Sequence, residues 1–393
     1  MAPNDGSVLQ GRAAALHAKG RTAEAIEQLT ALIGRNPLWT EGHRTLAHLR
    51  GQLGLDPATA IQDAIAEHPL HPVLHQMLIA TRLEARDHDG AATAVAAADR
   101  IFGEANWLFQ LAAHVASERG EIARADTYFG NCALKGIDEV GSWVRHLIRA
   151  GRPEAIEPAV APWAENDRDN ILWPYRALAW RMLADPRAAW LEGDRRLIGV
   201  YDLADDIRDF AGLAVHLRGL HVASHAPLDQ SVRGGTQTDG NLLVRDEAPI
   251  RALRTLILQR VREHIAQLPP AIDGHPTLLR RRDPLRIAGS WSVRLCNEGF
   301  HSDHVHSQGW ISSALYISLP GATPDGDAPD RHAGWLSLGE CRELVPGLTP
   351  FRLVEPRLGR LVLFPSTMWH GTRAFPAGER LTIAFDIARP QQG

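Results

Sequence analysis

The chain has 393 residues, 45% hydrophobic and 22% charged, and a formal net charge of −4; it is long enough for two or three domains and offers no basic surface of the kind that binds nucleic acid. Its three cysteines are scattered and never in CxxC spacing, which indicates thiols in a reducing compartment rather than a disulfide framework or a zinc knuckle. No window approaches about 18 apolar residues, and the first residues lack a signal-peptide pattern, so we expect a cytoplasmic protein without a membrane partner.

The first half of the chain carries a repeat that predicts stacked helix pairs. In its clearest copy, residues 20–37, small Ala25 and bulky Leu29 lie on a helix that Pro37 ends. Glycines recur at intervals of 30 to 36 residues, at Gly20, Gly54, Gly90, Gly120 and Gly151. Such a period, with small residues where helices cross, resembles tetratricopeptide (TPR) repeats. A plain alanine-rich helical bundle with accidental glycine spacing is the alternative.

Helical character continues beyond the repeats. Residues 171–183 favour a helix, and we expect the helical region to end near residue 200. Residues 202–220 and 250–268 also favour helices, the second of them by the spacing of its apolar side chains.

The segment between these last two helices, residues 225–243, is rich in glycine and polar side chains and predicts a loop. Arg233, Thr236 and Gln237 lie in it. Because loops often cover functional sites, we expect these three side chains to face a substrate. A plain connection is the alternative, since no predicted strand precedes this loop and no phosphate-binding pattern matches it.

From about residue 285 the pattern changes to short, strand-like runs separated by Gly, Pro and Asp. The runs are residues 287–296, 310–319, 334–339, 359–365 and 380–388. Helices followed by strands indicate separate domains.

We therefore predict two domains of different class. Residues 1–200 would form an all-α, TPR-like repeat domain, and residues 201–393 a second domain with a β-rich core at about 285–390 and supporting helices. Residues 322–334 are too polar for a core and predict an exposed hairpin loop.

A pair of histidines at the start of one strand-like run is the clearest chemical signal. His304 and His306 are two residues apart, so in an extended strand both side chains point to the same face. His370, after the run LVLFP, would supply a third imidazole. Three ligands on one side of an ion leave its other positions open, as in non-heme Fe(II) oxygenases, most of which use two histidines and a carboxylate.

A second pair competes for the same role. His301 and Asp303 provide the more usual His-x-carboxylate spacing. The two registers differ by an odd number of residues, so a regular strand cannot present both pairs inward. We favour the His304 register because it lies nearer to the apolar run at residues 310–319.

Arg380 follows His370 by ten residues and shares one face of its strand with Thr382. A buried guanidinium needs an anion, and bidentate binding of a cosubstrate carboxylate would supply it, with the threonine hydroxyl as a further donor. A structural ion pair with an unidentified acid is the alternative. Tyr316 and Arg294, on neighbouring strand-like runs, are candidates to contact the cosubstrate.

These residues carry a resemblance to a known family. Residues 285–388 resemble the double-stranded β-helix, or jelly roll, of 2-oxoglutarate/Fe(II) oxygenases, and are most similar to a bacterial family with an HxHP motif followed by a W/L-x-S-G/S strand. HVHSQGWISS (304–313) matches that motif, except that Ser307 replaces the proline. The resemblance implies Fe(II) and 2-oxoglutarate as cofactors with O2 as oxidant, and it carries the distal His and Arg over to His370 and Arg380.

A TPR-like domain before such a barrel is also similar to the layout of aspartyl/asparaginyl β-hydroxylases, where the position two residues after the first metal histidine is not a carboxylate. This likeness implies a hydroxylase with a peptide or protein substrate, recruited by the repeats, although repeats also mediate self-association. Two other classes remain open: a TPR adaptor with a degenerate barrel, and a three-histidine cupin-type dioxygenase that does not use 2-oxoglutarate.

Overall fold

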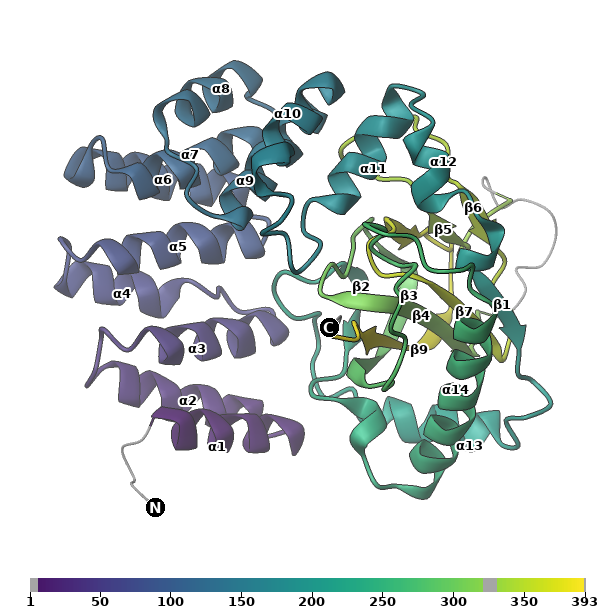
Figure 1. Ribbon diagram of the computed structural model, residues 1–393. Coiled ribbons are helices and arrows are strands. Elements are labelled where there is room, and N and C mark those ends of the chain that lie inside the picture. The colour runs from purple at the N-terminus through teal and green to yellow at the C-terminus, as the bar shows by residue number, and fades with distance from the viewer. Residues whose placement is uncertain (1–5, 321–330, 392–393) are drawn as a thin grey trace. The chain divides into compact units, whose positions relative to one another are not determined.

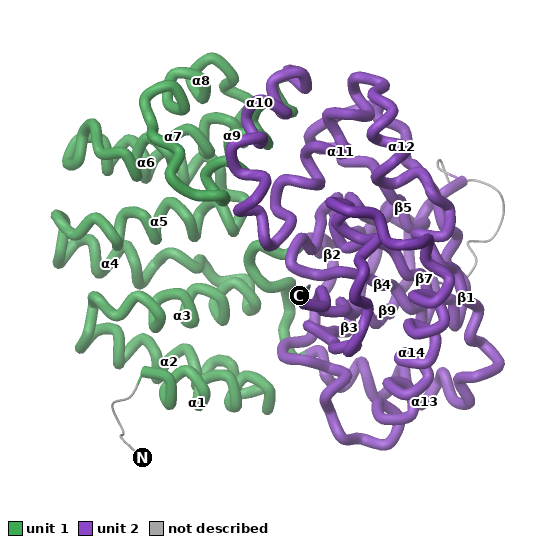
Figure 2. Tube along the Cα trace, in the orientation of Figure 1, with its two compact units in different colours: residues 1–150, 222–230 green, residues 151–221, 231–393 purple. Residues whose placement is uncertain are grey.

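The computed structural model describes residues 6–320 and 331–391 of the chain (Figure 1). They divide into two compact units, residues 1–150 with 222–230, and residues 151–221 with 231–393 (Figure 2). The predicted hairpin loop at 322–334 lies mostly outside the described residues. None of the described helices combines the length and the apolar character needed to cross a membrane.

The first unit is a stack of antiparallel helices, as the TPR-like repeat predicted (Figure 1). Fully buried alanines, among them Ala25, Ala91 and Ala125, let neighbouring helices pack closely. The helices are α1 (Gly6–Ala18), α2 (Thr22–Ile33), α3 (Thr40–Gln52), α4 (Thr59–Glu67), α5 (Pro72–Glu84), α6 (His88–Phe102), α7 (Asn106–Glu118), α8 (Ile122–Asn131) and α9 (Ile137–Arg149).

The glycine period marks the ends of alternate helices. Each of the following glycines stands two residues after a helix end, with φ between +69° and +75°: Gly20, Gly54, Gly120 and Gly151. The left-handed conformation closes the last helical turn and costs glycine nothing. After α5 the same position is taken by Arg86, with φ +58°, whereas Gly90 lies inside α6. Gly90 was therefore wrongly assigned to the glycine period. The third position of the period is residue 86, which is an arginine and so could not be recognised from the glycine spacing.

The second unit contains two antiparallel sheets that form the predicted jelly roll. The larger has the order β1-β7-β4-β9-β3-β2, and the smaller β6-β5-β8. The strands are β1 (Gly199–Asp202), β2 (Val232–Gln237), β3 (Ile287–His301), β4 (Gly309–Ser318), β5 (Leu336–Leu338), β6 (Arg352–Val354), β7 (Arg360–Pro365), β8 (His370–Thr372) and β9 (Glu379–Ala388).

Helices support these sheets. They are α10 (Ile156–Val160), α11 (Trp173–Met182), α12 (Arg187–Glu192), α13 (Phe210–Arg218) and α14 (Ala248–Gln267), with single 3₁₀ turns at Pro153–Ala155, Ala161–Trp163, Arg195–Leu197 and Leu242–Val244. The helix predicted at 250–268 is α14, whereas only the second half of the helix predicted at 202–220 forms.

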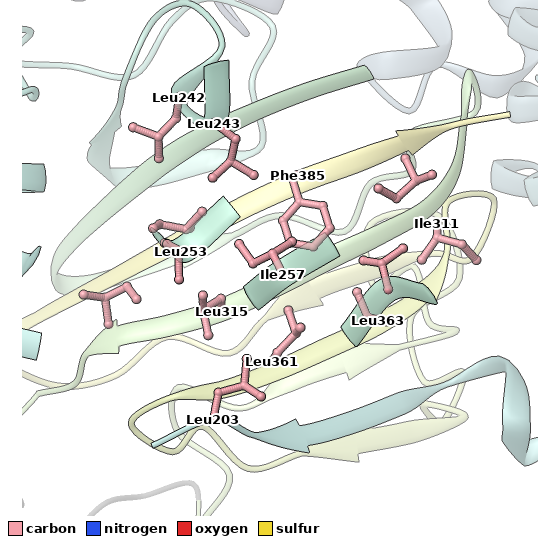
Figure 3. Close-up of a cluster of buried hydrophobic side chains, with 14 of the residues drawn as sticks. Leu203, Leu242, Leu243, Leu253, Ile257, Ile311, Leu315, Leu361, Leu363 and Phe385 are labelled. Atoms are coloured by element: carbon pink, nitrogen blue, oxygen red, sulfur yellow. The ribbon is translucent and has the colours of Figure 1, made fainter. Parts of the chain in front are cut away.

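Both faces of the larger sheet are buried. Side chains at alternate positions of β7 pack into two different hydrophobic clusters, one on each face. Leu361 and Leu363 join a cluster with Leu253 and Ile257 of α14 (Figure 3). Val362 and Phe364 point the other way, into a second cluster with side chains of β5 and β6. The run LVLFP (361–365) is continuously apolar because it is buried on both faces. The residues of the candidate site lie on the face toward the smaller sheet.

The predicted domain boundary at residue 200 differs from the division in the structure, which assigns residues 151–200 to the second unit. β1 is an edge strand of the larger sheet, paired with β7. The indole of Trp369 also donates a hydrogen bond to the carbonyl of Pro174 in α11. These segments look helical or neutral in sequence, but their pairing partners lie far along the chain.

Candidate metal centre

Three histidines converge between the two sheets. Each of His304, His306 and His370 offers one ring nitrogen, and these three atoms lie within 4.8 Å of one another. His370 is the first residue of β8. His304 and His306 lie in the connection from β3 to β4, whereas the sequence predicted them to lie in a regular strand. The convergence nevertheless brings together the three residues predicted as metal ligands.

Backbone hydrogen bonds hold two of these residues together. His304 and His370 form an isolated antiparallel bridge, in which each backbone N–H donates to the other's carbonyl at 2.9 Å. The amide of His306 donates to the carbonyl of Ser366 at 3.0 Å. The main chain thus fixes the spacing of the three side chains.

Each of the three rings has an acceptor at Nδ1. The acceptor is the carbonyl of Ser302 for His304 at 2.9 Å, and the carbonyl of Met368 for His370 at 3.0 Å. For His306 it is the carboxylate of Asp386, at 2.8 and 2.9 Å. Because an acceptor requires a proton on Nδ1, a neutral ring carries its lone pair on Nε2. The hydrogen bonds therefore select the tautomers that can bind a metal ion through three Nε2 atoms.

Burial keeps the rings of His304 and His370 neutral. It lowers the pKa of His304 to about 3, with a further contribution from the nearby His306. It lowers the pKa of His370 well below its ordinary value, and His304 adds to the shift. At neutral pH no proton therefore competes with a metal ion for the lone pairs of these two rings.

Asp386 belongs to this site, although it was not predicted from the sequence. It lies on β9, and its carboxylate accepts hydrogen bonds from His306 and, at 2.6 Å, from Ser312. A carboxylate behind a metal-binding histidine orients the ring and raises its basicity. A signal was present: after Glu379, the polar residues of β9 are Arg380, Thr382 and Asp386, which all fall on one face of the strand.

The side chains of the alternative ligand pair, His301 and Asp303, take part in other interactions. The carboxylate of Asp303 accepts three hydrogen bonds from Arg342, from its backbone amide at 2.7 Å, Nε at 2.8 Å and Nη2 at 2.6 Å. Its side chain is 2% exposed. His301 Nδ1 lies 2.9 Å from the hydroxyl of Ser231. The geometry therefore favours the His304 register.

Arg380 is a buried guanidinium without a carboxylate partner among the described residues. Nη1 donates to the carbonyl of Gly334 at 2.7 Å and Nη2 to the hydroxyl of Thr372 at 3.0 Å, whereas Nε has no hydrogen-bond partner in the described part of the chain. The hydroxyl of Tyr316, close enough to interact electrostatically, is buried and equally unpaired there. Unpaired buried donors around a positive charge fit a carboxylate ligand.

Thr382 and Arg294 lie on opposite faces of the larger sheet. Thr382 is buried, is paired with Tyr316 across β4 and β9, and shares the face of Arg380. Arg294 is paired with Leu381, so it points away from that face, and its Nε donates to Glu379 at 2.6 Å. The expectation that Arg294 contacts a cosubstrate is wrong, because strand alternation turns it outward.

The predicted substrate loop is partly a strand, β2, which pairs with β3. Gln237 lies opposite Val293, itself opposite Thr382, and so faces the site. Thr236 points the other way and lies 2.8 Å from Nδ1 of His221. The charge of Arg233 contributes to lowering the pKa of His304, so this residue is close to the histidines. The prediction of a loop was wrong because the pairing of β2 with β3 is irregular at Gly234 and Gly235, and two glycines in sequence are typical of a loop rather than of a strand.

Ser231, just before β2, is a further residue that sequence reasoning missed. Its hydroxyl lies 2.9 Å from Nδ1 of His301 and 3.3 Å from Nε2 of His304, so it touches the atom expected to bind metal. A lone serine in a polar segment gives no sequence signal of such a contact.

Comparisons with known proteins cover the part of the chain that holds these histidines. Residues 289–386 match the model of a family described as "Putative 2OG-Fe(II) oxygenase". The predicted resemblance to such oxygenases is thus confirmed, and the predicted cofactors, 2-oxoglutarate and Fe(II), are those in the family's description. No curated protein matches the chain.

Three solved structures are similar to parts of the chain. A prolyl-4-hydroxylase from Pseudomonas putida is 17% identical, with a TM-score of 0.34, over 54% of this chain and 99% of its own. A tetratricopeptide repeat protein from Parabacteroides merdae is 14% identical, with a TM-score of 0.34, over 47% and 75%. HygX from Streptomyces hygroscopicus, with nickel and 2-oxoglutarate bound, is 15% identical, with a TM-score of 0.32, over 51% and 85%.

Proposed function

Because residues 289–386 match a family of 2-oxoglutarate-dependent Fe(II) oxygenases, we propose that the protein is such a dioxygenase and hydroxylates a peptide or protein substrate. The observation that carries the proposal is the set of three ring nitrogens within 4.8 Å of one another, on rings that each have a hydrogen-bond acceptor at Nδ1. Iron held there would supply the redox chemistry that couples oxidation of 2-oxoglutarate by O2 to hydroxylation of the substrate.

The protein's own residues hold and orient the reactants. His304, His306 and His370 hold the metal, and Asp386 keeps the ring of His306 in its binding tautomer. Arg380 binds the far carboxylate of 2-oxoglutarate. The hydroxyls of Thr382 and Tyr316 assist it. Its burial strengthens this charge-assisted contact because little water competes for the guanidinium.

The helical unit supports a polypeptide substrate, because stacked helix pairs present an extended surface suited to binding peptides. The unpaired Nε of buried Arg380 favours a 2-oxoglutarate enzyme over a three-histidine cupin, which needs no clamp for a cosubstrate carboxylate. None of Cys132, Cys296 and Cys341 forms a disulfide, in keeping with the cytoplasmic location that we propose.

The test is anaerobic addition of Fe(II) and then 2-oxoglutarate, followed by the visible charge-transfer band that forms when a 2-oxo acid chelates Fe(II). The wild type should give the band, and His306→Ala should abolish it. Release of succinate from 2-oxoglutarate under air should follow the same pattern. A wild-type protein that is loaded with Fe(II) but gives no band on adding 2-oxoglutarate would refute the proposal.

A further inference from the structure

The helical unit contains a cavity of about 710 Å³ that no step of the proposed chemistry uses. It is lined chiefly by α3, α5, α7 and α9, the first helices of successive pairs. Met77, Trp107 and Leu111 give it an apolar wall. A space of this size falls within the range of ligand pockets, about 300–1,000 Å³, and can hold two or three amino-acid side chains.

The chain itself shows how this unit binds a polypeptide. Residues 222–230 return to the helices, and the amides of Ser224 and His225 donate to the carbonyl of Gln52 at 3.1 and 3.0 Å. The amide of Asp229 donates to the carbonyl of Glu84 at 3.2 Å. Gln52 and Glu84 are the last residues of α3 and α5, whose end carbonyls lack donors within the helix. The backbone of the segment therefore supplies most of these donors, and the hydroxyl of Ser224 adds one more to the carbonyl of Gln52 at 3.1 Å.

Side-chain packing confirms how closely this segment, residues 222–230, approaches. A Cβ atom on Gly51 would lie 2.8 Å from Leu228, and one on Gly54 would lie 2.6 Å from the ring of His225. Leu228, Asp229 and Gln230 then form part of the cavity lining. The cavity is thus the space left beside a bound stretch of polypeptide.

The charges around this space are predominantly negative. Arg44 is the single arginine or lysine among the described residues that line it, and it is paired with Glu41. The lining carboxylates are Glu84, Asp138, Glu139 and Asp229. The carbonyl ends of α3 and α5 add negative potential where they meet the segment. Burial and the neighbouring Asp229 raise the pKa of Glu84 more than Arg44 and His48 lower it, so an arriving cation would further stabilise the ionised carboxylate.

We propose that this cavity is the docking site for the substrate polypeptide, which binds as an extended segment beside residues 222–230. A lysine or arginine of that segment lies against Glu84 and Asp138, and an apolar side chain packs on Met77, Trp107 and Leu111. That the bound polypeptide is the substrate rests on the proposed oxygenase function, whereas its binding does not. Along the chain, Gln230 of the lining is followed directly by Ser231, which contacts His301 and His304.

The experiment selects ligands for the full-length protein from a phage-displayed library of random dodecapeptides. The peptides that emerge should be enriched in Lys and Arg and carry a large apolar residue. Synthetic versions should bind at least about threefold more weakly to Glu84→Gln/Asp138→Asn, since two solvent-exposed ion pairs, each of modest strength, would be lost together. The matched control is Glu27→Gln/Asp63→Asn, which neutralises two exposed carboxylates on α2 and α4 and should leave binding unchanged.

The outcomes separate this proposal from the proposed function. No enrichment, enrichment of acidic peptides, or equal binding to both double variants would overturn the docking site. The Fe(II)/2-oxoglutarate band of Glu84→Gln/Asp138→Asn, measured in parallel, should equal that of the wild type. If basic peptides bind at the cavity but do not accelerate succinate release by the iron-loaded enzyme, the cavity is a peptide-binding site. The claim that the bound polypeptide is the substrate would then be refuted.

Discussion

Asp386 offers the sharpest test of the metal centre because it touches no predicted ligand of the cosubstrate. Its carboxylate accepts from Nδ1 of His306 with both oxygens and from the hydroxyl of Ser312 with one. Loss of such a support costs about 10–100-fold in metal affinity, or about 1.4–2.7 kcal/mol. In Asp386→Asn the charge is lost and an NH2 group replaces one acceptor oxygen, but the other acceptor oxygen remains, so we expect about a tenfold loss. In Asp386→Ala both are lost, and we expect about a hundredfold loss.

The assay is anaerobic competition for Fe(II) between each variant and a chromogenic chelator, with thermal unfolding of the metal-free proteins measured alongside. Asp206→Asn is the matched control, because that carboxylate pairs with Arg260 at the surface and should leave the affinity unchanged. A folded Asp386→Ala protein that binds Fe(II) within about threefold of the wild type would refute the view that this carboxylate prepares His306 for a metal.

Three further predictions follow from the same contacts. Arg380→Ala should raise the Kd for 2-oxoglutarate at least about a hundredfold, with Fe(II) affinity kept; an unchanged Kd, read by titrating the charge-transfer band, would remove Arg380 from the cosubstrate site. His306→Ala should abolish Fe(II) binding, whereas Asp303→Asn should retain it and instead lower the melting temperature, because Arg342 loses its partner; metal analysis of both variants decides between the registers. Because burial lowers the pKa of His304 from 6.5 to about 3, the unfolded chain takes up a proton that the folded apoprotein refuses as the pH falls below 6.5. The free energy of unfolding of the apoprotein, measured in urea, should therefore fall between pH 7 and pH 4, and a flat profile would contradict this prediction.

Local signals allowed much of the fold to be predicted from the sequence. The helix period, the apolar run at β7 and the His304–His306 spacing each depend on residues close together in the chain. Arg380 was recognisable because a guanidinium within an apolar strand is costly unless a ligand or partner needs it.

What the sequence could not predict depends on long-range pairing. β2 and β3 pair through an irregular register at Gly234 and Gly235, and no pattern within residues 225–243 indicates it. The outward direction of Arg294 follows from its pairing with Leu381 on β9. Asp386 was visible as a polar residue at an inward position, but its role required knowing that His306 lies beside it.

The paired backbone hydrogen bonds between His304 and His370 have a consequence for which metal the protein carries. Because the main chain fixes these two ligands before any ion arrives, the site cannot reshape itself around the small differences between divalent ions. Nitrogen ligands bind Co(II), Ni(II) and Zn(II) more tightly than Fe(II). Zinc should therefore act as an inhibitor that displaces iron, and the enzyme's activity in a cell would depend on how scarce free zinc is kept.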